Sequence, residues 1–262
     1  MDATWIIAAF VVIDTLMERL GHRSDVRAQV PDSEILTIAV VAATYVGSHH
    51  ERAVQIMHGC GSRSGRISVS RCNRRLHQRA DGMAWIPDVL GEVFTTGDGF
   101  MIDSLPLPVC RRVRARRWRK VRGRACCGYC AAKRETFVGW RVHLVCRPDG
   151  VPVRVPMLPA GVRLACPPGR GGWAIQPPRA PLMRPASWRR RGCAWFPVRR
   201  ATMRPHAWFM DAIAVRAYRH PMETVNRHLE TMGIERLYAR PNAGVELKVH
   251  ATLIALICTN MN

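Results

Sequence analysis

The sequence predicts an α/β protein, with an N-terminal helical domain over residues 1–95 and a mixed β-sheet core with flanking helices over 97–262. Up to about residue 95, apolar side chains recur at helical spacing between Gly- and Ser-containing breaks. Beyond Gly97 the pattern changes to short β-rich runs separated by Pro and Asp-Gly turns. With 262 residues, 48% of them hydrophobic, the chain is long and apolar enough to form a folded core.

The helical domain begins with two helices that differ in their expected burial. Trp5–Leu20 forms the first, and Gly21 ends it. The second opens in the segment PDSE, where Asp32 or Ser33 can accept from the first backbone N–H groups and Glu34 favours the positive end of the helix dipole. Its apolar run ILTIAVVAATYVG predicts a central, buried helix, and HHERAVQIMHGC predicts a shorter third helix.

A fourth, basic helix is expected in SVSRCNRRLHQRA, after the loop GCGSRSGRIS, with Ser68 or Ser70 as its cap. A basic helix that follows a short turn can enter a DNA groove as a recognition element, and a solvated basic face explains the pattern equally well. Its basic residues are Arg71, Arg74, Arg75 and Arg79, with Leu76 between them.

The sheet core begins with the β-rich run FMIDS, which we expect to end at Asp103 before a turn that contains prolines. TFVGWRVHLVC and VPVRVPMLP, joined by RPDG, predict a β-hairpin whose turn is formed by Pro148, Asp149 and Gly150. The element order of the core therefore starts with one strand and continues with a hairpin.

Two helices are expected near the end of the chain, after patterned sequence resumes at about Phe196. PMETVNRHLETMGIERL predicts a helix with Pro221 in its first turn and Gly233 as an interruption or end. GVELKVHATLIALICTN predicts an apolar closing helix. The stretch 164–194 contains no Asp or Glu and shows no period, so we expect it to be disordered.

The charge balance indicates a nucleic-acid partner. Lys and Arg number 40 against 19 Asp and Glu, which gives a net charge of +21. Such a charge repels itself unless a polyanion neutralises it, and a solvated basic surface or a ribosomal-type RNA binder is the alternative. In the basic loop CRRVRARRWRKVRGRACC, Arg116, Arg117 and Lys120 beside Trp118 suit contact with phosphates, and a disordered basic linker is the alternative.

Cysteine usage and hydropathy predict a cytoplasmic protein without a membrane partner. No secretory signal is recognised, so the ten cysteines are expected to stay reduced. The apolar run TWIIAAFVVI ends at Asp14 and Glu18, short of the roughly 20 residues that a membrane span needs. Cys127 and Cys130 form a CxxC that could be half of a zinc site, but a structural zinc site usually needs a second such pair.

Two acids stand out as candidate catalytic and metal-binding residues. Asp103 follows a hydrophobic strand, and Glu223 lies in the first turn predicted for a late helix; alone, each is a common turn or helix-dipole residue. The order of first strand, hairpin, unpatterned middle and late acidic helix is that of an RNase H-like fold. In that fold an Asp on the first strand and an acid on a late helix share Mg²⁺ ions that support phosphoryl transfer.

A resemblance to a known family is carried by four segments of the core: FMIDSLPLPVCRRVRARRWRK, GYCAAKRETFVGWRVHLVCRPDGVPV, PVRRATMRPHAW and AYRHPMETVNRHLETMGIERLYARPNAGVELKVHATLIAL. SEILTIAVVA and SRCNRRLH extend it into the helical domain. These segments resemble insertion-sequence DDE transposases of the family numbered 982. The resemblance implies Mg²⁺-dependent cleavage and strand transfer of DNA, with transposon ends and target DNA as partners, in the cytoplasm at the nucleoid. A homodimer that bridges two ends is expected by analogy.

The resemblance also implies roles for individual residues. Asp103 is the first catalytic acid and Glu223 the third, both as Mg²⁺ ligands. Arg219, four residues before Glu223 in an Arg-x-x-x-Glu pattern, would contact DNA near the scissile phosphate. Lys133 in AAKRETFVGW fits a DNA contact, with an ordinary surface lysine as the alternative. Two further positions of the family pattern depart, because its Tyr would fall at Arg216 and its later Lys at Glu230.

The second catalytic Asp of the family is missing. It belongs on a strand between the hairpin and the late helix, yet no acid occurs between Asp149 and Asp211. The composition of 164–194 is that of GC-rich DNA read out of frame, so two compensating frameshifts explain it, and a genuine insertion is the alternative. We therefore expect this copy to bind DNA weakly or not at all and not to transpose. The competing function class is a non-catalytic basic nucleic-acid-binding protein, a transposase remnant.

Overall fold

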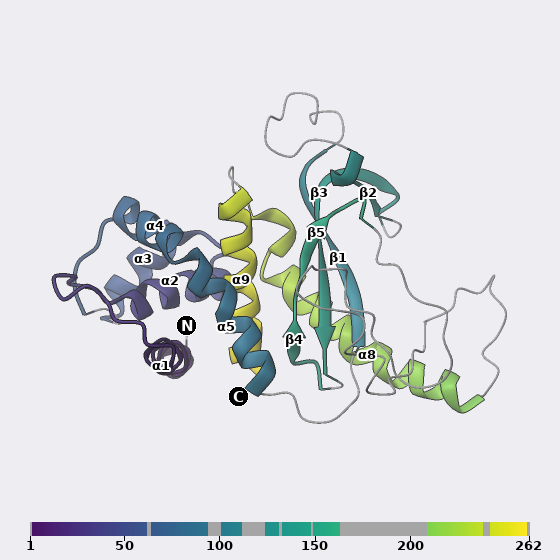
Figure 1. Ribbon diagram of the computed structural model, residues 1–262, viewed down its shortest axis with the longest axis horizontal. Coiled ribbons are helices and arrows are strands. Elements are labelled where there is room, and N and C mark those ends of the chain that lie inside the picture. The colour runs from purple at the N-terminus through teal and green to yellow at the C-terminus, as the bar shows by residue number, and fades with distance from the viewer. Residues whose placement is uncertain are drawn as a thin grey trace. The chain divides into compact units, whose positions relative to one another are not determined.

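The computed structural model describes residues 2–61, 64–93, 101–111, 124–130, 133–147, 149–162, 209–237 and 242–260. These residues form seven α-helices and one antiparallel sheet of five strands, which confirms a mixed α/β protein (Figure 1). The chain divides into a helical unit, residues 1–93 with 228–262, and a sheet unit, residues 94–227. None of the helices in the described segments has both the length and the apolarity that crossing a membrane requires.

The helical unit is built around two apolar helices. Its helices are α1 (Ala3–Arg19), α2 (Asp32–Tyr45), α3 (His50–Gly59), α4 (Val69–Gln78), α5 (Ala80–Val93) and α9 (Asn242–Asn260). The predicted central position of α2 is confirmed, because most of its residues are buried and it contacts α1, α3, α4 and α9. The closing helix α9 is buried on all sides over residues 251–258 and contacts α2 and α5. It therefore joins the helical unit, whereas the sequence predicted that it belongs to the sheet core.

Helix ends were predicted with mixed success. Gly21, with φ +72°, follows the end of α1 as expected. Ser68 caps α4, and its hydroxyl accepts from the Arg71 N–H. The cap prediction for α2 is wrong, because Pro31 occupies the cap position, and the Asp32 N–H donates to the hydroxyl of Ser24 at 2.8 Å. Asp32 instead turns into the interior of the helical unit and forms ion pairs there.

The sheet unit is organised around one long strand. Its elements are β1 (Met101–Arg111), β2 (Cys127–Cys130), β3 (Glu135–Cys146), β4 (Pro152–Arg154), β5 (Met157–Pro159) and α8 (Phe209–Thr231). β1 pairs with β3 along most of its length, and β2, β5 and β4 also pair with β3. The predicted hairpin is confirmed, with Gly150 at φ +88° and the Asp149 carboxylate accepting from the Val151 N–H at 3.2 Å.

The first strand is longer than predicted. The expectation that it ends at Asp103 is wrong, because β1 continues through Pro106 and Pro108 to Arg111. Along β1, the N–H positions of residues 104, 106 and 108 point to the same side of the strand. The Ser104 N–H on this side donates to the Asp103 carboxylate and not to β3. The missing N–H groups of the two prolines thus fall on the side of β1 away from β3, where a proline does not interrupt the ladder.

The late helix is also longer than predicted. α8 begins at Phe209, so the expectation that Pro221 lies in its first turn is wrong. The helix continues through this proline and ends at Thr231. Gly233, with φ +77°, follows the last residue of the helix. Of the two predictions for Gly233, an interruption or an end, the second is confirmed. The longer α8 carries Glu223 in its interior, where side chains three or four residues apart share a face.

The sheet presents one apolar face to α8. Because side chains alternate along a strand, Asp103 lies on the same face as Leu105 of β1 and as Val142 and Leu144 of β3. These three aliphatic side chains are buried. α8 passes along this face (Figure 1) and buries Val225 beside the hairpin turn. Asp103 is the one charged residue that the described parts of β1 and β3 place on this face.

Candidate functional site

A hydrogen bond joins Asp103 of β1 to Asn226 of α8. The carboxylate is half-buried, and its Oδ1 accepts from the Ser104 N–H at 2.7 Å. Its Oδ2 accepts from Nδ2 of Asn226, at 2.6 Å, across 123 positions of sequence. The position of Asp103 is thus fixed by its strand on one side and by α8 on the other.

Glu223 lies close to this contact along the helix. It is three residues before Asn226, so the two side chains share a face of α8 and are separated by about 4.5 Å along the helix axis. Glu223 is exposed, while Asn226 is half-buried. Asp103 therefore contacts a side chain that lies about one helical turn after Glu223 on α8. These are the two acids that the sequence predicted for one site.

The donor atoms around Asp103 suit a hard divalent cation such as Mg²⁺. The candidate ligands are the carboxylates of Asp103 and Glu223 and the Asn226 amide, whose Oδ1 is buried and has no hydrogen-bond partner among the described residues. Mg²⁺ and Mn²⁺ prefer carboxylate and carbonyl oxygens. The described residues contain no group of three or more His, Cys, Asp or Glu that could hold a metal ion. The residues present fit one cation.

The electrostatics around Asp103 favour an external cation. Both donors to its carboxylate are neutral, and among the described residues no Lys, Arg or His forms an ion pair with it. Its neighbour Cys146 stays a neutral thiol, because burial, followed by the charges of Asp103 and Asp149, raises the pKa of that thiol far above its usual range. Within the described part of the chain, no cationic side chain therefore compensates the charge of Asp103.

The predicted basic contacts on α4 divide into two groups. Arg71 and Arg74 are exposed, while Cys72 and Leu76 of the same helix are buried. Arg75 instead turns inward: its Nε and Nη2 donate to Asp32, and its Nη1 donates to the Val30 carbonyl at 2.6 Å. Because its guanidinium is held in this way, Arg75 is explained by the fold, whereas Arg71 and Arg74 remain available to a phosphate.

The remaining predicted DNA contacts are only partly described. Lys133 is exposed in the turn before β3. Arg219 lies in α8 one turn before Glu223, and its side chain is outside the described part. The basic-loop residues Arg116, Arg117 and Lys120 lie outside the described residues, as does the stretch 164–194 in which the second catalytic Asp is missing.

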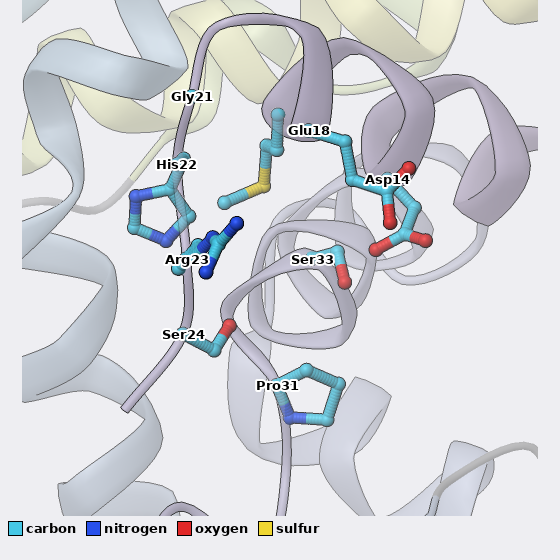
Figure 2. Close-up of a pocket in the computed structure, with 9 residues that line it drawn as sticks. Asp14, Glu18, Gly21, His22, Arg23, Ser24, Pro31 and Ser33 are labelled. Carbon is cyan, nitrogen blue, oxygen red and sulfur yellow. The ribbon is translucent and has the colours of Figure 1, made fainter. Parts of the chain in front are cut away.

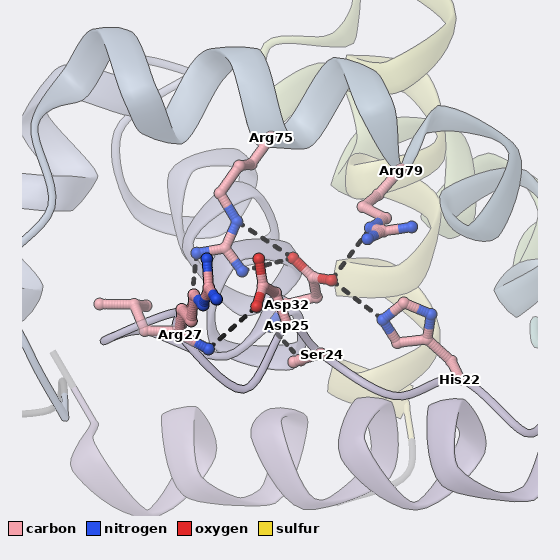
Figure 3. A network of polar contacts seen from close by, with 8 residues as sticks. His22, Ser24, Asp25, Arg27, Asp32, Arg75 and Arg79 are labelled. Carbon is pink, nitrogen blue, oxygen red and sulfur yellow. Dashed lines mark hydrogen bonds and ion pairs between the residues drawn. The ribbon is translucent and has the colours of Figure 1, made fainter.

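A network of polar contacts around Asp32 stabilises the helical unit and was not foreseen from the sequence (Figure 3). Asp32 is 2% exposed, and its Oδ2 lies 3.0 Å from His22 Nε2 and 3.0 Å from Arg79 Nε, while Arg75 binds Oδ1. Burial acts to raise the pKa of Asp32. The hydrogen bond and charge of Arg75, with His22 and Arg79, outweigh burial and hold that pKa below its ordinary value.

A hollow of about 440 Å³ lies beside this network (Figure 2). Its walls carry both signs of charge, from Asp14 and Glu18 of α1 and from His22 and Arg23 of the following turn. It belongs to the helical unit and contains neither Asp103 nor Glu223. The hollow is therefore distinct from the predicted metal site.

The CxxC segment has strand geometry. Cys127 pairs with Val138 and Cys130 with Glu135 on β2 and β3. Residues three apart in a strand point to opposite faces of the sheet. The two thiols therefore cannot bind one zinc ion in this conformation, which removes the sequence argument for half of a zinc site.

Asn226 is the residue at this site that sequence reasoning missed. Its signal was present in METVNRHL, where a polar side chain recurs three residues after Glu223 on a helix that buries Met222 and Val225.

Comparison of the chain with protein-family models, with curated proteins and with solved structures gave no match. The resemblance to transposases therefore stays a prediction.

Proposed function

We propose that the sheet unit is the core of a metal-dependent protein of the phosphoryl-transfer class that acts on DNA. More particularly, we infer descent from an insertion-sequence DDE transposase of the family numbered 982, in a copy that no longer transposes. The observation that carries the proposal is the 2.6 Å hydrogen bond between Asn226 and Asp103. It supports a shared role for Asp103 and Glu223, because Glu223 lies three residues before Asn226 on the same helix.

The residues divide the work of such a site. Asp103 and Glu223 would hold Mg²⁺, which activates the attacking oxygen and stabilises the leaving oxygen when bound. Asp103 is kept in place by the Ser104 N–H and the Asn226 amide. Arg219 would contact the DNA backbone, and the net charge of +21 favours binding of the polyanion.

Loss of transposition follows from the charge count. Two carboxylates contribute two negative charges, whereas a pair of Mg²⁺ ions carries four positive charges. Without the second Asp of the family, a second ion is under-neutralised and lacks a ligand. Asp103 and Glu223 would still suffice to hold one cation, which would supply positive charge for binding a phosphate.

The proposal is tested with supercoiled DNA and Mg²⁺ or Mn²⁺. The present chain should not nick or join DNA, whereas a chain in which 164–194 is replaced by the translation of the alternative frame should do so. Asp103→Asn or Glu223→Gln in the restored chain should abolish the reaction. An inert restored chain together with a cutting present chain would contradict the proposal.

A non-catalytic basic nucleic-acid-binding protein is the second candidate. It is favoured by α4, which exposes Arg71 and Arg74 beside the buried Cys72 and Leu76. The two candidates differ in one measurement. If DNA binding is independent of divalent cations and of Asp103→Asn, the second candidate explains the chain better.

A further inference from the structure

One polar atom at the candidate site lacks the partner that its burial requires. Asn226 donates through Nδ2 to Asp103, and its Oδ1 is buried without a hydrogen bond among the described residues. The orientation of the amide is settled by chemistry, because an ionised carboxylate only accepts and must therefore face the NH₂ group. A buried carbonyl oxygen without a donor is costly, so we expect Oδ1 to gain a partner, either a hydrogen-bond donor or a cation.

We propose that Asn226 supplies the third oxygen ligand of a single divalent cation, together with Asp103 and Glu223. This inference rests on the proposed function and adds to it. The three residues come from β1 and from one face of α8, and the Asn226 side chain already contacts Asp103. Amide oxygens are ordinary ligands of hard cations. The amide would thus supply a third oxygen ligand, without the charge that the missing second Asp would have brought.

The alternative is that Asn226 only positions Asp103. In that case Nδ2 is the atom that matters, and Oδ1 is satisfied by a buried water. An Asp at position 226 separates the two explanations, because it keeps both oxygens as ligands and removes the donor. As a cation ligand it should improve on Asn, since affinity rises with the number of charged ligands. As a partner of Asp103 it should fail, since two carboxylates repel each other.

The experiment measures Mn²⁺ binding to the full chain by isothermal titration and by the loss of the free Mn²⁺ resonance signal. Asn226→Ala should weaken the Asp103-dependent site about tenfold, and Asn226→Asp should tighten it about tenfold. Gln55→Glu is the matched control, because it adds the same charge at an exposed position of α3 and should leave the affinity unchanged. Circular dichroism with and without Mn²⁺ verifies folding, and Asn226→Ser, which keeps an oxygen, should lose less affinity than Asn226→Ala.

Each outcome separates this inference from the proposed function. If Asp103→Asn abolishes binding while Asn226→Ala and Asn226→Asp both match the wild type, the third ligand is not Asn226 and the proposed function stands. If both Asn226 variants weaken binding equally, Asn226 only positions Asp103. If the wild type has no Mn²⁺ site that Asp103→Asn removes, the inference and the metal-dependent function both fail.

Discussion

Each of the two units holds an aspartate against a helix, but only the aspartate of the helical unit is paired with basic side chains among the described residues. In the helical unit, Asp32 is 2% exposed and is bound by Arg75, Arg79 and His22. In the sheet unit, Asp103 accepts from a backbone N–H and from the neutral amide of Asn226. The chain contains 40 Lys and Arg residues, so basic side chains are not scarce. Asp32 thus has its counter-ions within its own unit, whereas the described residues supply none to Asp103, as we expect of an aspartate that binds a cation.

The first prediction tests the difference between Asp32 and Asp103 by removing each carboxylate in turn. Asp32→Ala leaves two guanidinium groups and His22 without their acceptor, and we expect a loss of about 3–5 kcal/mol in the free energy of unfolding. Asp103→Asn removes a charge to which the described residues give no counter-ion, and we expect a change within about 1 kcal/mol. Chemical denaturation followed by circular dichroism measures both.

Asp25→Ala is the control for this pair. Asp25 is exposed and accepts from the Arg27 N–H within its own turn, so its removal should cost less than about 1 kcal/mol. If Asp103→Asn destabilises the protein as much as Asp32→Ala does, both aspartates are structural. The argument for an open cation site would then lose its basis.

The second prediction uses pH and concerns His143 on the other face of the sheet. His143 is 3% exposed, both its ring nitrogens lack partners, and burial, with the charge of Arg141, lowers its pKa to about 4. Its contribution to stability is complete above the unfolded pKa of about 6.5 and is lost as the pH falls towards 4. His143→Leu should reduce that loss by about 2–3 kcal/mol.

His143→Gln serves as the comparison, because it removes titration but keeps a buried polar group. Both variants should flatten the pH dependence of unfolding between pH 6.5 and 4, and only His143→Leu should also be more stable than the wild type at pH 7. Below pH 4, Asp32 adds a further loss, because its pKa is lowered and its carboxylate is protonated only there. An unchanged pH profile in His143→Gln would contradict the assignment.

Local patterns predicted much of the fold, and long-range pairing explains what they missed. Apolar periodicity and end signals gave the helices α1 to α4 and α9, and the Asp149-Gly150 turn gave the hairpin. The local sequence predicts Asp32 as a helix cap. Its partner in the structure is Arg75, which lies 43 positions later and which no local pattern connects to it. The two prolines of β1 were taken for a turn because only the pairing with β3 shows which edge they face.

The candidate site shows the same limit. Asp103 and Glu223 were predicted from their residue types, their neighbours and a resemblance. That α8 begins at Phe209 and returns Asn226 to Asp103 depends on a contact across 123 positions, which no local pattern contains. The role of an amide residue at such a contact can be recognised only when both partners have been placed in the fold.

The third prediction compares the two units at two glycines that have positive φ angles, Gly150 and Gly21. Gly150→Ala in the hairpin turn should cost about 1–2 kcal/mol, because φ is +88° and the new Cβ would lie 3.1 Å from Val225 of α8. Gly21→Ala in the helical unit meets the same backbone penalty at φ +72° with no atom within 4 Å, so it should cost about 1 kcal/mol. Equal costs would show that α8 is not packed against the hairpin turn. Thermal unfolding of both variants provides the measurement.

The smallest expected effects concern DNA binding by α4, where exposed and internally paired arginines alternate on one helix. Arg71→Gln and Arg74→Gln should each weaken binding to duplex DNA at low salt and reduce the slope of log K against log salt by roughly 0.9. Arg75→Gln removes the same charge, yet it should leave the slope unchanged and destabilise the helical unit, because that guanidinium binds Asp32 and Val30. Fluorescence anisotropy over a salt series distinguishes them. If Arg75→Gln lowers the slope like the other two at full folding, Arg75 also contacts phosphate, and α4 does not divide its arginines between fold and DNA.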